Sequence, residues 1–227
     1  MVILLFGPPG CGKGTQADSL ARRFAIPAIS TGEMFRAECK AGTELGRKAS
    51  AVLAAGGLVG DEIVNGMVVN RISREDCANG FLLDGYPRTV PQARFLAYLL
   101  EERGLVQPAV VHLAVPESVL VARLTARRQC PQCLRIYNLI SQPPLADGQC
   151  DRDGARLLTR EDDREAVIRQ RLRAYEAATR PLLEWYGAAA VFPVDGGQPP
   201  ERVTDAIEHA LVSTGLGIPS AVVRQAL

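Results

Sequence analysis

A glycine-rich stretch near the N-terminus combines a lysine with the backbone freedom that phosphate binding requires. Residues 7–15 read Gly-Pro-Pro-Gly-Cys-Gly-Lys-Gly-Thr, and Gly7 to Lys13 fits the pattern G-x-x-x-x-G-K. Backbone N–H groups of such a loop can surround phosphate oxygens, and the lysine adds a positive charge for the outer phosphates. The pattern usually continues with Ser or Thr, whereas here Gly14 precedes Thr15. The stretch therefore predicts a phosphate-binding site.

The neighbouring sequence contains the elements needed to position this loop. Residues 2–6 are an unbroken apolar run, which is typical of a strand buried on both faces. After Thr15, apolar residues recur with helical spacing at Ala17, Leu20 and Phe24. A strand, a glycine loop and a helix N-terminus in this order direct amide groups and the helix dipole towards an anion.

Strand and helix patterns alternate along the rest of the chain. Further short apolar runs that could be strands lie at 25–30, 81–84, 109–115 and 191–194. Helices are expected to start near Thr31, Thr43, Asp61, Thr89, Pro116 and Pro200. Such alternation implies an α/β protein whose parallel sheet is covered on both faces. Residues 30–59 are expected to be a helical excursion between two parts of this core.

The ends of several helices depend on single residues. Ser30 or Thr31 is expected to cap the helix that starts near Thr31. Asp61 is expected to cap the helix that starts there. The helix that begins at Pro116 is expected to continue through Arg123, Arg127 and Arg128. The apolar residues from Gly215 on are weakly patterned and fit either a short surface helix or a frayed tail.

A carboxylate stands where a parallel sheet would bring it near the phosphate loop. Asp84 ends one of the apolar runs, and ligands of open parallel sheets bind beyond the carboxyl ends of the strands. There the carboxylate could hold magnesium or its bound waters. An Asp after a strand can also be a helix cap or a turn residue. The nearby phosphate loop favours the metal interpretation.

Residues 128–160 interrupt the alternation and contain the spacing of a metal site. Cys130 and Cys133 form a C-x-x-C pair, and Cys150 and Asp153 repeat that spacing after a gap of sixteen residues. Three thiolates and a carboxylate can complete a closed, structural zinc site. A redox pair would be expected to follow a strand, and a disulfide is disfavoured in a cytosolic protein. A nucleic-acid-binding zinc ribbon would need a basic and aromatic stripe that this insertion lacks.

Composition limits the other classes of function. Apolar residues make up 47% of the 227 residues, which is sufficient for a core, and the net charge of +1 favours neither nucleic acid nor a membrane surface as partner. No apolar stretch approaches the ~18 residues of a membrane span. The apolar N-terminal run is too short for a signal peptide and lacks a basic start. We expect a cytoplasmic protein.

Five separated motifs together resemble those of the adenylate kinase family. They are the glycine loop, Ser30-Thr31-Gly32-Glu33-Met34-x-Arg36, Leu82-Leu83-Asp84-Gly85-Tyr86-Pro87-Arg88, Gln92, and Thr159-Arg160-x-Asp162-Asp163. The resemblance covers about residues 1–213 and includes the long insertion of the large-lid form, in its zinc-bearing variant. Residues that depart from those common in the family are Cys11, Glu33, Gly60, Tyr86 and Asn138. None of these departures removes a charged partner.

The resemblance implies the reaction ATP + AMP ⇌ 2 ADP, with magnesium bound to ATP, carried out by a monomer. It also implies a three-layer P-loop fold with a five-stranded parallel sheet. The core would comprise residues 1–29, 60–125 and 164–227. A helical NMP-binding insertion, 30–59, would close over AMP, and a zinc-bearing LID insertion, 126–163, would close over ATP.

The resemblance also implies roles for individual residues. The ATP site would comprise Gly10, Cys11, Gly12, Lys13, Gly14, Thr15, Arg123, Arg127, Ile136, Tyr137 and Gln198. The AMP site would comprise Thr31, Arg36, Gly57, Leu58, Val59, Gly85, Arg88, Gln92, Arg160 and Arg171. The catalytic residues would be Lys13, Arg88, Arg127, Arg160 and Arg171. The amide of Gln92 would meet the adenine edge. Because the acceptor is already an anionic phosphate, such a site needs no general base, and guanidinium groups can hold phosphate oxygens in pairs.

Three other functions are compatible with parts of this pattern. A kinase for GMP, UMP or CMP would share most of these residues, although Thr31 and Gln92 favour AMP. A regulatory nucleotide switch would bind without turnover, and Asp84, the arginines and the complete lid argue against it. A zinc-ribbon nucleic-acid binder would need a basic stripe, which the net charge of +1 does not suggest.

Overall fold

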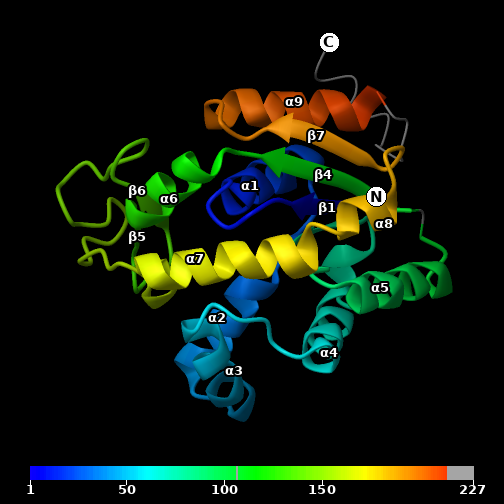
Figure 1. The fold of residues 1–227 in the computed structure, drawn as a ribbon, viewed down its shortest axis with the longest axis horizontal. Coiled ribbons are helices and arrows are strands. Elements are labelled where there is room, and N and C mark those ends of the chain that lie inside the picture. The colour runs from blue at the N-terminus through cyan, green and yellow to red at the C-terminus, as the bar shows by residue number, and fades with distance from the viewer. Residues whose placement is uncertain (106, 214–227) are drawn as a thin grey trace.

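A parallel sheet of five strands, in the order β2-β3-β1-β4-β7, forms the centre of the protein (Figure 1). The computed structural model describes residues 1–105 and 107–213. The strands of this sheet are β1 (Val2–Phe6), β2 (Ala28–Ser30), β3 (Phe81–Asp84), β4 (Ala109–Ala114) and β7 (Val191–Asp195). The predicted fold class, a five-stranded parallel sheet within an α/β protein, is confirmed.

The apolar strand β1 lies in the middle of the sheet and contributes to both faces. Ile3 and Leu5 belong to one core cluster and Val2, Leu4 and Phe6 to the other, because successive side chains of a strand point to opposite faces. All five are at most 2% exposed. β1 pairs with β3 on one side and with β4 on the other, so the loop that follows it starts from a strand that is buried throughout.

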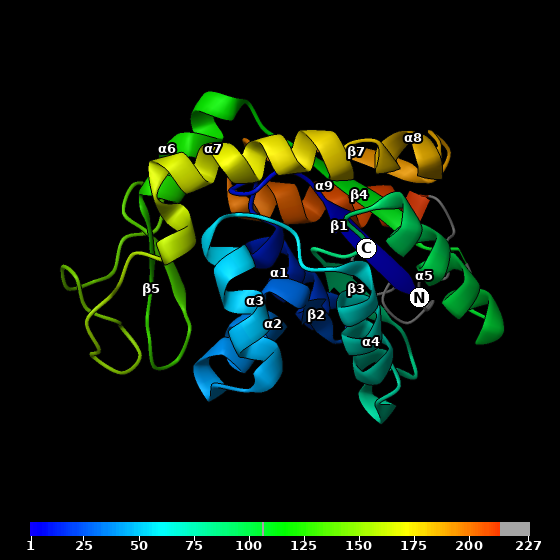
Figure 2. The same ribbon diagram turned by 60° about the horizontal axis from the view of Figure 1, so that its bottom comes forward.

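Helices cover both faces of this sheet and make three layers (Figures 1 and 2). The core cluster that contains Ile3 receives side chains from α1 (Lys13–Phe24), α6 (Glu117–Thr125), α7 (Glu165–Ala174) and α9 (Pro200–Ser213). The cluster that contains Leu4 receives them from α2 (Thr31–Ala41), α3 (Glu44–Ala54), α4 (Asp61–Ile72), α5 (Val90–Glu102) and α8 (Leu182–Tyr186). Three short segments complete the helical elements, namely η1 (Glu75–Cys77), η2 (Glu161–Asp163) and the π-helix η3 (Tyr175–Thr179).

The predicted helix starts are right, but two predicted caps are wrong. Ser30 occupies the cap position of α2 without a side-chain cap bond, and the Thr31 hydroxyl instead donates to the Gly85 carbonyl at 2.9 Å. Asp61 is the first residue of α4, after Gly60 at the cap position, and its carboxylate contacts residues of α5. The Thr31 hydroxyl and the Asp61 carboxylate thus bind partners outside their own helices instead of capping them.

The helix predicted to run through Arg127 and Arg128 ends earlier. α6 stops at Thr125, and both arginines lie on β5 (Arg127–Gln129), which pairs antiparallel with β6 (Ile136–Asn138). The backbone groups of β5 bond to those of β6, and Gln129 also bonds to Leu158. These bonds replace the ones that the same groups would have made within a longer helix. This two-stranded sheet carries the cysteine insertion.

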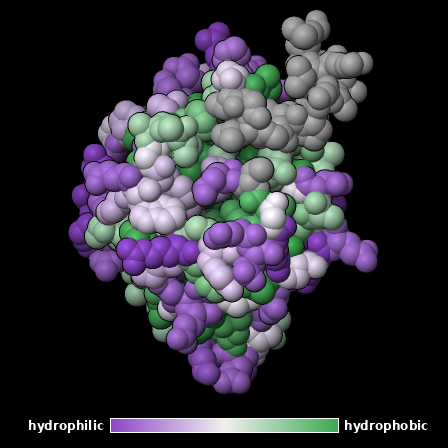
Figure 3. All heavy atoms as spheres, turned by 90° about the vertical axis from the view of Figure 1, so that its right-hand side faces the viewer, coloured by the Kyte–Doolittle hydropathy of each residue, from purple (hydrophilic) through white to green (hydrophobic). Residues whose placement is uncertain are grey.

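On the face shown in Figure 3, hydrophilic residues are interspersed with hydrophobic ones. Within residues 1–105 and 107–213, no helix is both long and apolar enough to cross a bilayer. The residues from Gly215 on, for which a surface helix or a tail was expected, lie outside the described residues.

Truncating Leu4 should test the importance of the central strand. Leu4 is 0% exposed and pairs in register with Leu83 and Val110, so Leu4→Ala should lower the free energy of unfolding by about 2–5 kcal/mol. Leu145→Ala is the matched control, because Leu145 is 94% exposed; it should change that free energy by less than about 0.5 kcal/mol. Denaturant unfolding followed by circular dichroism measures both. Equal effects would contradict a core centred on β1.

Candidate active site

A cavity of about 490 Å³ lies beyond the carboxyl ends of β1 and β3. Its wall is contributed by residues within 5–16, 30–36, 53–58, 84–88, 123–127, 136–142, 160–162, 171–179 and 196–203. The volume lies within the usual range of small-molecule sites. The position agrees with the rule that parallel sheets bind ligands at this edge.

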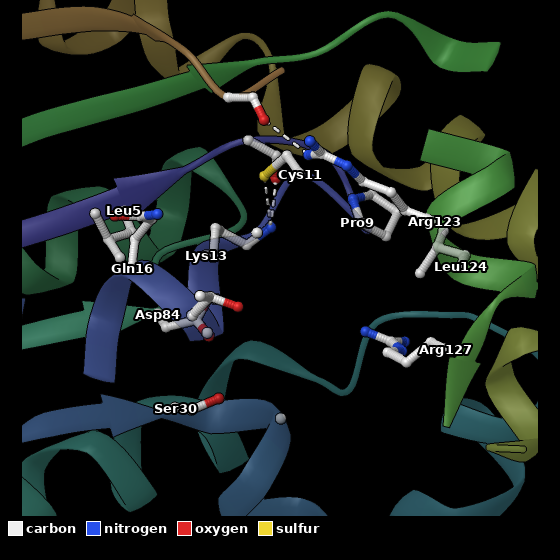
Figure 4. A pocket seen from close by; sticks show the side chains of 18 of the residues that line it. Leu5, Pro9, Cys11, Lys13, Gln16, Ser30, Asp84, Arg123, Leu124 and Arg127 are labelled. Carbon is white, nitrogen blue, oxygen red and sulfur yellow. Dashed lines mark hydrogen bonds between the residues drawn. The ribbon is translucent and has the colours of Figure 1, made fainter. Parts of the chain in front are cut away.

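The loop between β1 and α1 forms one side of this cavity. Gly7 and Gly10 have φ angles of 146° and 87°, and a Cβ on Gly10 would lie 2.8 Å from Leu124 Cγ. Glycine is therefore required for both the conformation and the close packing. The Lys13 ammonium donates to the carbonyls of Gly7 and Pro8 at 2.7 and 3.0 Å, and lies 3.7 Å from Cys11 Sγ. Figure 4 shows Lys13 turned towards Cys11.

Positive charge is concentrated on the wall of this cavity. Seven cationic side chains line it, namely Lys13, Arg36, Arg88, Arg123, Arg127, Arg160 and Arg171, against three carboxylates, Glu33, Asp84 and Asp162. The chain as a whole has a net charge of only +1. In Figure 4, Asp84 and Arg127 face each other across the open space. Such an excess of cations in one hollow favours a polyanionic ligand.

Burial makes this excess costly without an anion. Desolvation lowers the pKa values of Arg36, Arg88 and Arg171. Desolvation, followed by the nearby charges of Arg127 and Arg36, lowers the pKa of Arg160 to about 9. Among the described residues, Arg160 Nη2 is also the one buried side-chain nitrogen or oxygen without a hydrogen-bond partner. Arg160 Nη2 therefore faces the cavity without an acceptor among the described residues, and a bound anion could supply one.

Two neighbouring carboxylates orient part of this cationic group. Asp163, whose side chain is 0% exposed, accepts from Arg127 Nε and Nη2 at 2.7 and 2.5 Å, and from Arg171 Nη1 at 3.2 Å. Asp162 pairs with Arg171 at 3.0 Å. Burial alone would raise the pKa of Asp162, but Arg171, Arg127 and Arg160 outweigh it and lower that pKa.

The four residues of the predicted metal site come together. The ligand atoms of Cys130, Cys133, Cys150 and Asp153 all lie within 4.8 Å of one another. The Asp153 carboxylate lies 3.3 Å from Cys130 Sγ, and Cys133 Sγ lies 3.5 Å from Cys150 Sγ. Tyr137 donates its hydroxyl to Cys150 Sγ at 3.3 Å. Three thiols and a carboxylate facing one point suit a tetrahedral ion.

Comparison with known proteins agrees with this geometry. The family model described as adenylate kinase matches residues 5–191. The chain belongs to the adenylate kinase family. An adenylate kinase of Desulforudis audaxviator is 49% identical over 205 residues, which cover 90% of this chain and 96% of that protein. One of Pseudothermotoga lettingae is 50% identical over 186 residues, covering 82% and 86%, and one of an Anaeromyxobacter species is 44% identical over 214 residues, covering 94% and 100%.

Most residues to which adenylate kinase roles were given lie on the cavity wall. Those that line it are Gly10, Cys11, Gly12, Lys13, Gly14, Thr15, Arg36, Gly57, Leu58, Asp84, Gly85, Arg88, Arg123, Arg127, Ile136, Tyr137, Arg160, Arg171 and Gln198. Thr31, Val59 and Gln92 do not line it. Thr31 and Gln92 are 3% and 2% exposed and lie behind the wall. The Tyr137 hydroxyl contacts the cysteine cluster.

Sequence reasoning missed several residues of this adenylate kinase cavity. Tyr175 and Thr179 line it from the π-helix η3; the Tyr175 hydroxyl lies 3.3 Å from His112 Nε2, and Thr179 donates to the Arg88 carbonyl at 3.1 Å. A π-helix has no simple sequence pattern, so no local signal identified them. Asp163, which orients Arg127 but does not line the cavity, belonged to one of the five motifs and received no role. The sequence feature that could have identified Asp163 is the acidic pair Asp162-Asp163 within an arginine-rich segment.

Neutralising Asp163 should destabilise the protein far more than neutralising an exposed partner. Asp163→Asn leaves the partly buried guanidinium groups of Arg127 and Arg171 without their shared, fully buried carboxylate, so the free energy of unfolding should fall by about 3 kcal/mol. Glu165→Gln removes the exposed pair with Arg169 and should cost less than about 1 kcal/mol. Urea unfolding at neutral pH compares the two variants. Comparable losses would show that Asp163 does not compensate the buried arginines.

Proposed function

We propose that the protein catalyses reversible phosphoryl transfer, ATP + AMP ⇌ 2 ADP, by direct in-line attack of one nucleotide on the other. The observation that carries this proposal is a single cavity lined by a glycine loop and seven cations. Two highly charged nucleotides must be held together there with water excluded, and fixed cations can do both. Family membership supports the same reaction class.

ATP would bind at the glycine loop and beneath the cysteine insertion. Backbone amides from Gly10 to Thr15 would surround the phosphates, with Lys13 released from its loop carbonyls to meet the outer ones. The remaining ATP contacts would come from Arg123, Arg127, Ile136, Tyr137 and Gln198. Magnesium carried by ATP would offset phosphate charge, and Asp84, which lines the cavity, would hold it through waters.

AMP would bind on the side of the 30–59 insertion. Its phosphate would meet Arg36 and Arg88, and its base would be surrounded by Thr31, Gly57, Leu58, Val59, Gly85 and Gln92. Because Gln92 is buried in this structure, we infer that the base reaches it when the insertion moves.

Transfer would depend on guanidinium groups placed around the moving phosphoryl group. Arg88, Arg127, Arg160 and Arg171 would meet charge that develops on its equatorial oxygens, together with Lys13. The acceptor phosphate is already anionic, so no proton needs to be removed. Arg160 Nη2, which is buried and has no hydrogen-bond partner in residues 1–105 and 107–213, is one donor available for this purpose.

Closure of two insertions on a fixed core would assemble this site. We propose a core of residues 1–29, 60–125 and 164–227, an NMP-binding insertion of 30–59 and a LID insertion of 126–163. The two insertions touch in this structure, where Lys40 Nζ donates to the Pro131 carbonyl at 3.1 Å. Such contact supports a shared closed state.

We further propose that the Cys130, Cys133, Cys150 and Asp153 cluster holds a structural zinc ion. The insertion has a core of only a few buried residues, among them Tyr137 and Leu157, and a metal would replace the missing apolar burial. A stiff insertion could then move as one body. A monomeric state and a cytoplasmic location stay predictions.

A coupled assay with ATP and each monophosphate should test the reaction. AMP should be the preferred acceptor over GMP, UMP and CMP. Lys13→Ala should lower kcat at least about 100-fold while the thermal unfolding midpoint changes little, because Lys13 meets phosphate charge in the transition state. A clear preference for another base would reassign the substrate, and turnover without Lys13 would overturn the role of the loop.

Metal removal should loosen the insertion before it stops catalysis. Chelation should release one zinc ion per chain, detected by native mass spectrometry, and lower the unfolding midpoint while some activity persists at low temperature. Cys130→Ser should reproduce this effect. Cys39→Ser, at a thiol outside the cluster that donates to the Gly46 carbonyl, is the matched control. Immediate complete loss of activity with an intact fold would indicate a catalytic metal instead.

A further inference from the structure

A buried carboxamide behind the nucleotide cavity is held at both of its ends. Gln92 Nε2 donates to Asp61 Oδ1 at 2.8 Å, and Gln92 Oε1 accepts from the Arg88 backbone N–H at 2.7 Å. Asp61 Oδ2 in turn accepts from the Thr89 hydroxyl at 3.0 Å. Within the described part of the chain these are the partners of the carboxamide. One of its N–H groups and one oxygen lone pair therefore stay uncommitted.

These two partners permit only one orientation of the carboxamide. A carboxylate only accepts hydrogen bonds, and a backbone N–H only donates. Half a turn of the Gln92 carboxamide would place its oxygen against the Asp61 carboxylate and its nitrogen against the Arg88 N–H. Two hydrogen bonds would become two repulsive contacts at a site that is 2% exposed.

The orientation decides which purine edge the remaining groups can bind. A 6-amino purine presents a donor at C6 beside an acceptor at N1, whereas a 6-oxo purine presents an acceptor at C6 beside a donor at N1. A glutamine that turns freely complements either edge. A glutamine held in one orientation complements one of them and leaves unpaired buried groups with the other, which gives strong discrimination.

We propose that Asp61 is a specificity-determining residue: it fixes the Gln92 carboxamide and thereby selects a 6-amino over a 6-oxo purine monophosphate. This inference rests on the proposed function, in which Gln92 meets the base of the acceptor nucleotide. Asp61 acts through Gln92 and is a positioning residue. Its position in the sequence predicted a helix cap instead, but in the structure Gly60 occupies the cap position of α4.

The placement of Asp61 supports this role. It begins α4, a few residues after Gly57 and Leu58 on the cavity wall. One turn later Asn65 also reaches across, and accepts from the Tyr86 hydroxyl at 2.6 Å. The Tyr86 hydroxyl approaches the Gln92 backbone carbonyl at 3.4 Å and not its carboxamide. Removing this hydroxyl therefore perturbs the same polar network without changing the partners that orient Gln92.

Inosine monophosphate is the sharpest probe, because it differs from AMP only at the edge in question. With the full chain, we would measure kcat/KM for AMP and for inosine monophosphate at saturating ATP. Asp61→Asn should lower the AMP preference about threefold or more, because an asparagine amide can turn together with Gln92 and so removes one of the two repulsive contacts of the turned carboxamide, while the contact with the Arg88 N–H stays repulsive. Asp61→Ala, which removes the acceptor, should change the preference in the same direction. KM for ATP should stay unchanged, and Tyr86→Phe should leave the preference within about twofold.

A double-mutant cycle separates this role from general support of the fold. In a Gln92→Ala background, Asp61→Asn should leave the remaining preference unchanged, because its effect passes through the carboxamide. Equal losses for both nucleotides, with a lower unfolding midpoint, would reduce Asp61 to a structural role and overturn the proposal. So would a lower KM for AMP at an unchanged preference, since Asp61 would then compete with the base. Absence of AMP-dependent turnover in the unaltered protein would instead refute the proposed function.

Discussion

The structure depends on one electrostatic constraint: several guanidinium groups are partly withdrawn from water around one cavity, and within the described residues the carboxylates beside them do not match their charge. Moving a cation out of water costs several kcal/mol unless an anion replaces the solvent. Here the cost is visible in the lowered pKa values of Arg36, Arg88, Arg160 and Arg171. The arrangement is stable because the sheet and the glycine loop fix its floor. The same arrangement would favour the binding of two nucleotides, because their phosphates would supply negative charge that the cavity wall lacks.

This constraint would also account for the proposed movement of the two insertions. A permanently closed cage of cations would be hard to form and slow to admit large anions. Placing some arginines on the core and others at the edge of an insertion divides the charge between two bodies. Arg88 follows a core strand, whereas Arg127 lies on β5, where the insertion begins. The proposed zinc ion would then support the shape of the insertion, because its core contains few buried residues.

The sequence predicted those parts of the fold whose signals are local. The run at 2–6 is apolar at every position, which predicted a strand buried on both faces. The glycines after it predicted a sharp backbone turn. The spacing of Cys130 and Cys133, repeated by Cys150 and Asp153, predicted that these four side chains come together, as they do. The predictions that were wrong concern residues with partners distant in the sequence. Asp61 was predicted to be a helix cap, but its carboxylate accepts from Thr89 and Gln92. The helix through Arg127 failed for the same reason, because its residues pair with β6.

The functional side chains share a pattern of support that no single motif reveals. Asp163 holds Arg127, Asp61 holds Gln92, and Asp195 Oδ2 accepts from Gln198 Nε2 at 2.8 Å. In each case a carboxylate holds a polar group that would face a nucleotide, and a carboxylate in that group's place would repel the phosphates. Carboxylates are strong acceptors and fix the direction of a donor, so behind the binding groups they add rigidity without opposing the ligand. A carboxylate in direct contact with the phosphates would thus oppose binding, whereas a carboxylate one contact further away favours it by orienting the group that binds.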